Sequence, residues 1–424
     1  MTALFPDGTP PPGICDEEGF LTWSELHDCA ELARAQIAAL ASEVVAVRVS
    51  SGRHLLVMLL AQRGLDKDLV VAGPVLDPGA LRVTGAGHLL HLDRVGRPSA
   101  VVDLPTEGEQ HRPPGSAAGI WVFSSGTSGH PVPTRHCWSG PGTAVSGRSW
   151  RRGEYWGIGY APFTFAGVTA TRQALDRADR IEYVDPADLL VGDHTCGGFD
   201  VVAATPSFWR IAAICARRDG RGVRRVNTVS TGGEPVDDLL LEAIATVIRP
   251  GRVKQIFGTT ETGTVIEVDD GRPGLPAQLA GQRLPTGAAF DVRDGMLIVS
   301  KGPDAPFVHT GDRVRLEAGR VLVIGRAGAL INVGGRKVDP VTVAGAVQRL
   351  PSVLAARAYA VRSPVLGHVV GVDVVVSGEQ PADEVADQVR EFSRRHLDPH
   401  ERPQRVRVVE SLAIERSGKL RTSE

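Results

Sequence analysis

Apolar and polar positions follow two different periods along the first hundred residues. Residues 23–40 place apolar side chains at helical spacing, and Thr22 with Glu25 three residues on has the pattern of a capping box. Continuous apolar runs at 44–50 and 69–73 predict strands, and the run at 54–64 predicts a buried helix between them. Strands that alternate with helices imply a mostly parallel sheet that is covered on both faces.

The same alternation continues through the middle of the chain. Residues 105–119 are polar and rich in Pro and Gly, which predicts a surface loop, and residues 119–131 then have the pattern of a strand and a turn. Further strand and helix patterns follow at 200–214, 226–236 and 254–263. Near 281–325 the pattern changes to short strands and turns, which predicts a small β subdomain.

The last hundred residues have a pattern of their own. The expected elements are two helices, three strands and their connections, at 341–350, 355–362, 368–377, 381–397 and 404–411. We therefore expect an α/β protein with two domains. A large N-terminal domain, residues 1–325, holds parallel and mixed sheets covered by helices and the small β subdomain, and a small C-terminal α+β domain holds residues 326–424.

Composition and charge exclude several classes of protein. The chain has 424 residues, of which 42% are apolar and 23% charged, which is typical of globular proteins and excludes a mostly disordered chain. The formal net charge is −2, so we expect no nucleic-acid partner and no binding to an anionic membrane. A transmembrane helix needs about 20 consecutive apolar residues, and the sequence contains no such run. Residues 1–13 lack the order of a signal peptide, and we expect a cytoplasmic protein.

Cysteine and lysine usage differ in what they indicate. The five cysteines are scattered and form no C-x-x-C pair, which predicts ordinary reduced thiols and neither a disulfide framework nor a structural zinc site. Lysine is rare beside arginine, with 5 lysines and therefore 47 − 5 = 42 arginines. The lysines are Lys67, Lys254, Lys301, Lys337 and Lys419.

Two segments carry residues suited to phosphate chemistry. Hydroxyl residues and glycines after an apolar strand can wrap phosphate oxygens, and they are Ser124, Ser125, Gly126, Thr127, Ser128 and Gly129. The pattern is not a Walker loop, and no serine lies in G-x-S-x-G. The second segment offers an aromatic ring for a base, a hydroxyl for phosphate and a carboxylate for Mg²⁺, and it comprises Phe257, Gly258, Thr259, Thr260, Glu261, Thr262 and Gly263. Taken alone, each segment also fits an ordinary turn.

Three further segments are weak signals when each is taken alone. His309-Thr310-Gly311-Asp312 is expected between short strands, where a carboxylate can accept hydrogen bonds from ribose hydroxyls. Gly334 and Gly335, in an otherwise apolar strand region, suggest a close approach of the backbone to another group. Residues 416–421, RSGKLR, form a basic C-terminal segment that also fits a solvated terminus.

Together and in this order, these segments resemble the acyl-adenylate-forming superfamily, which includes acyl-CoA synthetases, aryl-CoA ligases, adenylation domains and luciferases. The phosphate segment resembles the family's [ST]-S-G-[ST]-[ST]-G-x-P-K, and the later matches are FGTTE, HTGD, INVGGRKV and RSGKLR. The early LTWSEL and the STGGEP turn also have family counterparts. The resemblance covers nearly the whole chain.

The resemblance implies a small mobile lid that is hinged near Arg326–Gly328. It implies that Lys419, Thr260 and Glu261 are catalytic, with Glu261 also serving Mg²⁺, and that Ser124–Gly129 cradle pyrophosphate. The residues implied beside adenine are Gly233, Glu234, Pro235, Phe257, Gly258 and Thr259, and those at the ribose are Asp312 and Arg326. The residues implied at the acceptor thiol are Gly334 and Gly335. The implied substrate residues are Phe163, Phe165, Gly232 and Gly263.

The chain departs from the family pattern at several positions. Val132 stands where the phosphate segment usually ends in lysine, so Arg135 or His136 is a candidate replacement for that cation. Gly328 stands where the hinge usually carries Asp or Lys, and Phe257 replaces a tyrosine. Ala344-Gly345 replace a lid glutamate, and the N-terminal part is short for the family.

The expected function is ATP-dependent activation of a carboxylic acid to an acyl-adenylate, followed by transfer to a thiol of CoA or of carrier-protein pantetheine. Phe163 and Phe165 favour a small aryl or apolar acid, and equally fit core residues. Two alternatives remain open, a direct amide-forming ligase and a degenerate member that binds ATP or acyl-AMP with little turnover. Val132 and the short N-terminal part favour the degenerate member. The residues that together oppose it are Lys419, Glu261, Asp312 and Arg326.

Overall fold

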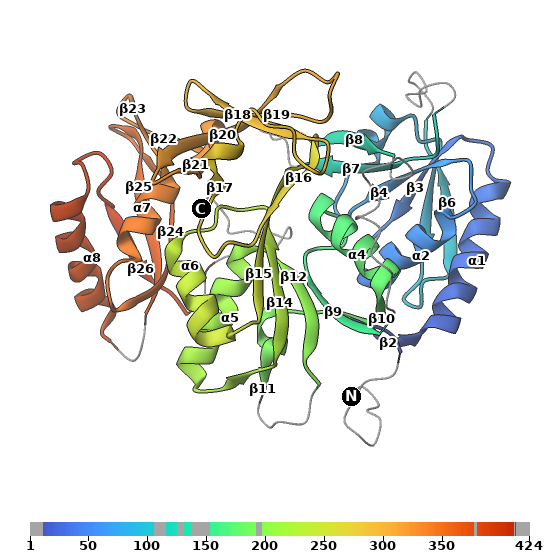
Figure 1. The fold of residues 1–424 in the computed structure, drawn as a ribbon, viewed down its shortest axis with the longest axis horizontal. Helices are drawn as coiled ribbons and strands as arrows, with labels where there is room; N and C mark the ends of the chain where they lie inside the picture. Colours follow the sequence, from blue (N-terminus) through green and yellow to red (C-terminus); the bar gives the residue numbers. More distant parts are fainter. Residues whose placement is uncertain are drawn as a thin grey trace.

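The computed structural model describes residues 12–105, 116–124, 131–137, 153–191, 197–376, 380–410 and 412. Two large sheets form the first part of the molecule, a smaller sheet follows, and a fourth sheet with two helices lies at the opposite end (Figure 1). This mixed α/β architecture confirms the expected fold class. The boundary at residue 326 stays a prediction.

The larger sheet has the strand order β16-β15-β14-β12-β9-β10-β1-β2. Its six inner strands are parallel, and the two edge strands are antiparallel to their neighbours. The strands are β1 (Gly13–Asp16), β2 (Gly19–Thr22), β9 (Glu154–Gly159), β10 (Ala178–Tyr183), β12 (Phe199–Ala204), β14 (Val226–Gly232), β15 (Arg252–Thr259) and β16 (Gly263–Val268). A short pair, β11 (Leu190–Val191) and β13 (Gly222–Val223), lies apart from them.

The second sheet has the order β6-β5-β3-β4-β7-β8, again with parallel inner strands and antiparallel edges. The strands are β3 (Val44–Arg48), β4 (Asp68–Ala72), β5 (His88–Leu92), β6 (Pro98–Asp103), β7 (Ile120–Ser124) and β8 (Val132–His136). The expected strands at 44–50 and 69–73 are therefore confirmed as neighbours in one sheet.

Helices fill the space between the two sheets and cover their outer faces. One core cluster joins α1, α2 and α4 to strands of both sheets, so these helices lie between them. Helices α5 and α6 pack on the other face of the larger sheet. The helices of this part are α1 (Trp23–Ala39), α2 (Gly52–Gln62), α3 (Pro78–Leu81), α4 (Phe165–Arg177), α5 (Pro206–Asp219) and α6 (Asp238–Ala243), the last followed by a π turn at Ile244–Ile248.

The capping box predicted at the first helix is present. The Thr22 side chain accepts a hydrogen bond from the Glu25 N–H, and the Glu25 carboxylate accepts one from the Thr22 N–H at 2.9 Å. This reciprocal pair satisfies two backbone donors that the helix leaves open. The buried helix expected at 54–64 is α2, in which almost every residue is buried.

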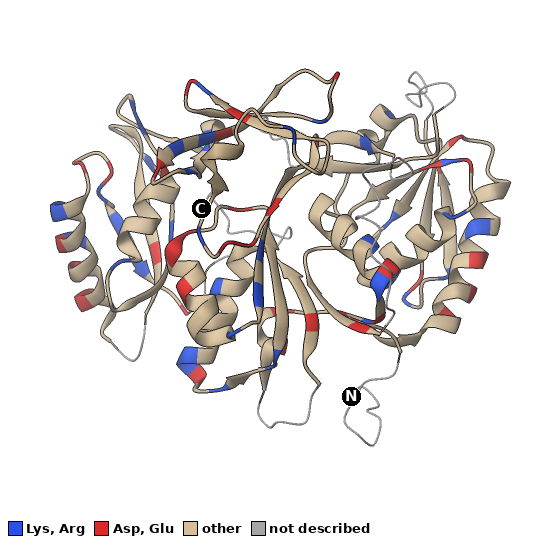
Figure 2. Cartoon of the chain, viewed as in Figure 1, with Lys and Arg blue, Asp and Glu red and all other residues tan. Residues whose placement is uncertain are grey.

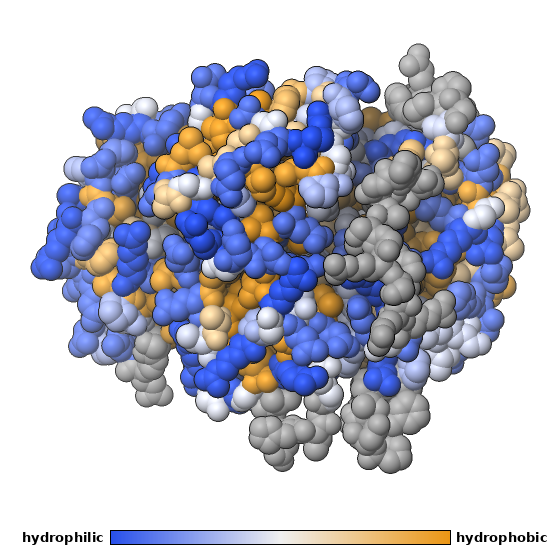
Figure 3. All heavy atoms as spheres, viewed as in Figure 1, coloured by the Kyte–Doolittle hydropathy of each residue, from blue (hydrophilic) through white to orange (hydrophobic). Residues whose placement is uncertain are grey.

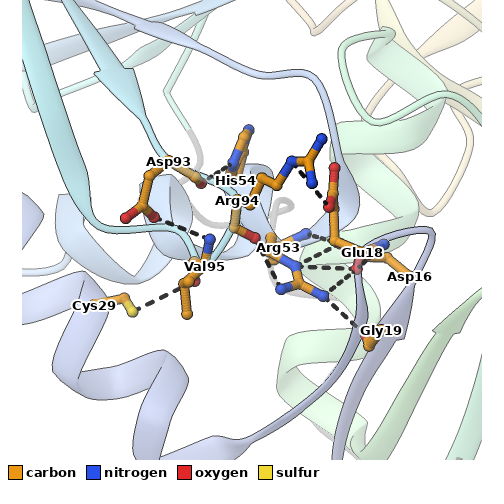
Figure 4. Close-up of polar contacts among 9 residues, drawn as sticks. All are labelled: Asp16, Glu18, Gly19, Cys29, Arg53, His54, Asp93, Arg94 and Val95. Carbon is orange, nitrogen blue, oxygen red and sulfur yellow. Dashed lines mark hydrogen bonds and ion pairs between the residues drawn. The ribbon is translucent and has the colours of Figure 1, made fainter.

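A buried ion pair joins the larger sheet to helix α2 (Figure 4). Arg53 of α2 donates to both carboxylate oxygens of Asp16 on β1, at 2.5 to 3.1 Å, and its side chain is 4% exposed. The same guanidinium donates to the carbonyls of Gly19 and Arg94, so each part of it has an acceptor. The neighbouring His54 bonds the Asp93 carbonyl at 2.8 Å, which ties α2 to the β5–β6 connection.

The expected β subdomain is a five-stranded sheet with the order β17-β21-β20-β19-β18. Its strands are β17 (Leu275–Pro276), β18 (Ala289–Arg293), β19 (Met296–Ser300), β20 (Val308–Glu317) and β21 (Arg320–Arg326). The four residues His309–Asp312 do not lie between short strands as expected. They lie inside the ten-residue β20, where Gly311 has φ of +81° and the pairing shifts register two residues later, so the strand bends without ending.

The C-terminal part has its own sheet and core. The sheet runs β23-β22-β25-β24, with β26 paired to β25, and its core cluster contains only residues from Ile331 onward. Its elements are β22 (Ile331–Val333), β23 (Arg336–Val338), α7 (Pro340–Val347), β24 (Val353–Ser363), β25 (Gly367–Val376), α8 (Ala382–His396) and β26 (Arg405–Val408). We call this part the lid, and the rest the large domain.

Charged residues of both signs occur in the large domain and in the lid. Acidic and basic residues are interspersed over both parts in Figure 2. Hydrophilic residues cover most of the face drawn in Figure 3, with apolar residues visible between them near the middle. No helix within the described residues is long and apolar enough to cross a membrane.

Candidate nucleotide and acid site

The predicted site residues gather where parallel strands of the larger sheet end. Strands β9, β14 and β15 end at Gly159, Gly232 and Thr259, and each leads directly into a predicted segment. The carboxyl ends of neighbouring parallel strands meet at one edge of a sheet, where open α/β sheets bind ligands. The Tyr160 hydroxyl donates to the Gly232 carbonyl at 3.3 Å and so connects two of these strand ends.

The segment Thr259–Thr262 is the tight connection between the antiparallel strands β15 and β16. Thr259 closes this turn, because its hydroxyl accepts from the Thr262 N–H at 3.1 Å and lies 2.9 Å from the Thr262 hydroxyl. Thr260 and Glu261 therefore stand at the tip of a braced hairpin, with Glu261 exposed. A rigid turn that presents a hydroxyl and a carboxylate suits phosphate and Mg²⁺.

The Gly233–Pro235 turn follows β14 and is held by helix α5. Glu234 accepts from the N–H and the hydroxyl of Ser207, both at 2.9 Å, at the start of α5. Gly233 has φ of +85°, a conformation that favours glycine. The carboxylate of Glu234 thus serves to fix the turn, which leaves the backbone of Gly233–Pro235 as the surface that can face a base.

The predicted ribose residues lie opposite each other on two paired strands. Asp312 of β20 pairs with Arg326 of β21, and the Arg326 Nε lies 3.4 Å from an Asp312 oxygen. Arg326 also donates to the Thr310 carbonyl at 2.8 Å, and the Thr310 hydroxyl accepts from the Asp312 N–H at 3.1 Å. The carboxylate is 13% exposed and is oriented by these neighbours.

Val132 stands where the phosphate segment usually ends in lysine, and Arg135, one of the two candidate replacements for that cation, is already paired. Val132 is 44% exposed at the start of β8, so no charge stands at that position. Arg135 is not available as a replacement, because it makes a two-pronged ion pair with the fully buried Asp68, at 2.5 and 2.9 Å. Asp68 also accepts from the Gly119 N–H and from the Trp121 indole, so it joins β4 to the β7–β8 hairpin.

His136 lies beside residues of two predicted segments, Phe165 and the Thr260–Glu261 turn. Its ring packs on Phe165 with centroids 4.9 Å apart, at the start of α4. Burial, with the Lys301 cation, lowers the pKa of His136 to about 4, against the opposing effects of a hydrogen bond to the Thr260 backbone and of the Glu261 carboxylate. The imidazole is therefore neutral at pH 7, so it supplies a hydrogen bond and no replacement charge.

Lys301 is the site neighbour that the sequence patterns did not single out. It follows β19 directly and acts electrostatically on His136. The signal that could have found it is the rarity of lysine in this chain. Lys67 and Lys254 have other partners, the carbonyl of Ser42 at 3.1 Å and Glu267 at 3.3 Å.

The aromatic pair predicted for the acid lies half-buried between core and site. Phe163 and Phe165 both pack against the cluster between the sheets, and Phe163 covers Gly73 at the end of β4. A Cβ at Gly73 would lie 3.1 Å from the Phe163 ring. Both expected roles, core residue and pocket wall, are compatible with this half-buried placement.

The structure does not bring the lid glycines to these residues. Gly334 and Gly335 form the exposed two-residue turn between β22 and β23, and both have positive φ. Two consecutive residues with positive φ are what a tight hairpin turn of this type requires. Figure 1 shows this hairpin at the outer side of the lid, away from the β15–β16 turn.

Two groups of predicted residues lie outside the part that the structure describes. They are Ser125–Gly129 of the phosphate segment and Lys419 with its neighbours in residues 413–424. Ser124 is described at the end of β7, where its hydroxyl donates to the Val132 carbonyl at 3.4 Å. Leu412 is buried in a small cluster with Ile214 of α5, seven residues before Lys419 in the chain.

Comparison with known proteins identifies relatives over different parts of the chain. Residues 342–419 match the family model described as AMP-binding enzyme C-terminal domain. The 4-chlorobenzoate–CoA ligase of an Arthrobacter species is 26% identical over 286 residues, which are 61% of this chain and 52% of the relative. The 4-hydroxybutyrate–CoA ligase 1 of Metallosphaera sedula is 24% identical, over 54% of this chain and 45% of the relative. The chain thus spans about half the length of the curated relatives it matches.

Solved structures match nearly the whole chain in fold. An anthranilate CoA ligase in complex with anthranoyl-AMP superimposes with a TM-score of 0.69 at 15% identity, covering 96% of this chain and 92% of that one. The o-succinylbenzoate CoA synthetase from Bacillus subtilis, in complex with its acyl-adenylate intermediate, gives a TM-score of 0.64 at 16% identity, covering 96% and 93%. At these identities the likeness establishes the fold alone.

Proposed function

We propose that the protein activates a carboxylic acid with ATP, as the matched C-terminal domain and the shared fold support. A carboxylate oxygen attacks the α-phosphorus, the bond from that phosphorus to the bridging oxygen breaks, and pyrophosphate leaves. The observation that most supports this proposal is the braced turn presenting Thr260 and Glu261 at the carboxyl edge of the sheet.

The nucleotide would lie across that edge. Phe257 and the Gly233–Pro235 backbone would enclose adenine, and Asp312 with Arg326 would hold the ribose. The Thr260 hydroxyl would bond the α-phosphate, and Ser124 with the five residues after it would contact pyrophosphate. The hydrogen bonds that already orient Asp312 and the Gly233–Pro235 turn lower the cost of ordering them on binding.

A magnesium ion fits the residues at the turn. Mg²⁺ usually keeps several waters and is held by one or two carboxylates together with substrate phosphates. Glu261 is exposed at the tip of the turn and can supply one such carboxylate. When bound, the ion would neutralise charge on the phosphates, while Thr260 and Glu261 hold the nucleotide in place.

Lys419 would complete the charge neutralisation during adenylate formation. An anionic carboxylate must approach a phosphorus surrounded by negative oxygens, and a lysine on the lid can lower that barrier. Movement of the lid away from the site after adenylate formation would open the site to a second substrate. We propose that this substrate is a thiol, of CoA or of carrier-protein pantetheine, with Gly334 and Gly335 beside it.

The acid that best fits the described residues is small and aryl or apolar. The neutral His136, which bonds the Thr260 backbone, and Phe165, which packs on it, present uncharged surfaces beside the Thr260–Glu261 turn, and Phe163 lies two residues before Phe165 in the chain. Such surfaces favour apolar ligands through burial of their area, and they favour rings through offset packing. Gly232 and Gly263 would form the wall opposite these side chains.

One observation favours a second candidate, a protein that binds ATP or acyl-AMP with little turnover. Val132 supplies no charge, and Arg135 is committed to Asp68, so one expected pyrophosphate contact is missing. A direct amide-forming ligase would share the first half-reaction and differ only in using an amine as the acceptor.

A pyrophosphate-release screen would test these alternatives. We expect a subset of aryl or short aliphatic acids to cause acid-dependent release without any acceptor, and mass spectrometry to detect an acyl-CoA when CoA is added. Formation of an amide in place of the thioester would favour the amide ligase. Binding of ATP in calorimetry without release by any acid would support the binding protein and contradict the proposed enzyme.

A further inference from the structure

A polar contact spans the proposed hinge between the large domain and the lid. Asp339 lies at the start of α7 in the lid, and its carboxylate is 3.3 Å from the Arg313 guanidinium on β20 of the large domain. The Asp339 side chain is 10% exposed and that of Arg313 is 34% exposed. The two residues stand on opposite sides of Arg326–Gly328 in the chain, so the contact depends on the orientation of the lid.

The Asp339 carboxylate packs closely against strand β21 of the large domain. Gly325 on β21 pairs with Arg313, and a Cβ at Gly325 would lie 2.8 and 3.0 Å from the two Asp339 oxygens. Any larger residue there would displace the carboxylate. The other Asp339 oxygen accepts from the Val341 N–H at 2.9 Å, which fixes the side chain as the cap of α7.

The contact lies next to the proposed ribose site. Asp312 pairs with Arg326, and the adjacent residues Arg313 and Gly325 form the next pair along the same two strands. A lid held by Arg313 is therefore held by the strand that carries the ribose carboxylate.

A second contact places Leu412, the last described residue, beside helix α5. Leu412 belongs to one buried cluster with Ala355, Val375 and Ile214. Ile214 is seven residues along α5 from Ser207, the partner of Glu234. At 1.5 Å per helical residue, this separation is about 10 Å. The seven residues from Leu412 to Lys419 can span up to about 25 Å when extended, so Lys419 is within reach of the nucleotide site.

We propose that Arg313 and Asp339 form a positioning pair that holds the lid in the orientation for adenylate formation, and that this contact opens before the acceptor reacts. The proposal rests on the proposed two-step function. The pair touches neither substrate, so it acts through the placement of the lid and of Lys419.

The test compares the two half-reactions in Arg313→Gln and Asp339→Asn variants. Asparagine is also a good helix cap, so Asp339→Asn removes the charge while α7 keeps its start. We expect acid-dependent pyrophosphate release to slow by about three- to tenfold, the range for a partly exposed ion pair. The reaction of preformed acyl-adenylate with the acceptor should be unchanged or faster.

Two further variants serve as controls. Arg315→Gln removes the same charge from the same strand, where Arg315 pairs with Glu317 at 2.8 Å and not with the lid, and should leave both half-reactions at wild-type rates. Arg313→Lys keeps the positive charge, so its rate of pyrophosphate release should lie closer to the wild-type rate than that of Arg313→Gln. Equal slowing of both half-reactions, or no effect in either variant, would overturn the positioning role.

A measurement that needs no turnover separates this proposal from the proposed function. Spin labels on unnatural amino acids at Leu32 and Val365, which are 53% and 87% exposed, report the distance between the two parts. In the labelled protein that keeps Asp339 we expect one dominant distance between the two labels. In the labelled Asp339→Asn variant we expect a second population of distances. An unchanged distribution would refute the pair as a latch, whatever the acid screen shows.

Discussion

Single residues at this site act through charge that their surroundings control. Arg135 is occupied by buried Asp68, and His136 is kept neutral by burial, although both looked like free cations in the sequence. Glu234 likewise looked like a ligand residue, and its carboxylate accepts hydrogen bonds from Ser207 at the start of α5. Among the described residues, Arg326 is likewise engaged, with Asp312 and the Thr310 carbonyl, whereas the charge of Lys301 acts on His136.

Replacement of Lys419 should separate the two half-reactions. We expect Lys419→Ala to slow pyrophosphate release by about 10²–10³, which corresponds to roughly 3–4 kcal/mol of lost charge stabilisation. Reaction of preformed acyl-adenylate with the acceptor should be largely intact, because the lysine is needed only while charge builds on phosphorus. Release at near wild-type speed in this variant would show that Lys419 does not have this role.

The buried imidazole of His136 should make stability depend on pH. Its pKa is about 4 in the folded protein and about 6.5 when unfolded, so between these values only the unfolded chain binds the proton. The free energy of unfolding should therefore fall as pH is lowered from 6.5 to 4, by up to about 3 kcal/mol.

The His136→Gln variant isolates this effect, since glutamine is polar and does not titrate. The facing charges, Lys301 and Glu261, are the same in both proteins. Urea unfolding at several pH values should show a smaller loss of stability in the variant between pH 6.5 and 4. Parallel pH profiles for the two proteins would mean that His136 titrates normally.

At the scale of elements, buried ion pairs join strands and helices that are distant in the chain. Asp68 ties β4 to the hairpin that carries the phosphate segment, and Asp16 with Arg53 ties β1 to α2. Such pairs add little net stability, but removal of one partner leaves a buried charge without compensation. They therefore determine how precisely the site-bearing strands are placed.

Arg53→Ala should destabilise the large domain strongly. We expect a loss of about 3–5 kcal/mol in the free energy of unfolding, because Asp16 would be left buried and unpaired. The matched control is Arg63→Ala at the end of the same helix, where Arg63 is 58% exposed and lies 3.6 Å from Asp176. That change should cost less than about 1 kcal/mol. Equal denaturation midpoints for the two variants would contradict a dominant role for the buried pair.

At the scale of the whole molecule, the proposed chemistry needs two positions of the lid. The lid contacts the large domain through Asp339 on Arg313 and through a cluster in which Ile214 of α5 packs with Ala355, Val375 and Leu412 of the lid. The proposed movement of the lid would have to break both contacts. The connecting residues Ala327–Ala329 form a single short turn, and Gly328 within it is exposed.

A proline at the hinge should trap one lid position. Gly328→Pro fixes φ near −65° and removes the freedom that glycine gives this turn. We expect it to spare adenylate formation and to slow acceptor transfer by at least about tenfold, since each position supplies different groups to the site. Rates measured separately for each half-reaction check this, and small equal effects on both would refute the hinge.

The sequence by itself determined the local elements and the order of the chemical segments. The capping box at Thr22, the buried helix α2 and the paired strands β3 and β4 follow from periodicity and capping, which act between residues near in the chain. Motif order was likewise sufficient for the family resemblance, because a shared fold keeps the same segments in the same order along the chain.

Only the tertiary structure decided which polar groups remain available. Whether Arg135 is free depends on Asp68, which is 67 residues away in the chain, and the neutrality of His136 depends on burial beside Phe165 and Thr260. The contact of Asp339 with Gly325 and Arg313 likewise forms between the lid and the large domain. Charge and desolvation act through space, so a pattern read along the chain reveals which residues can react but not which are already engaged.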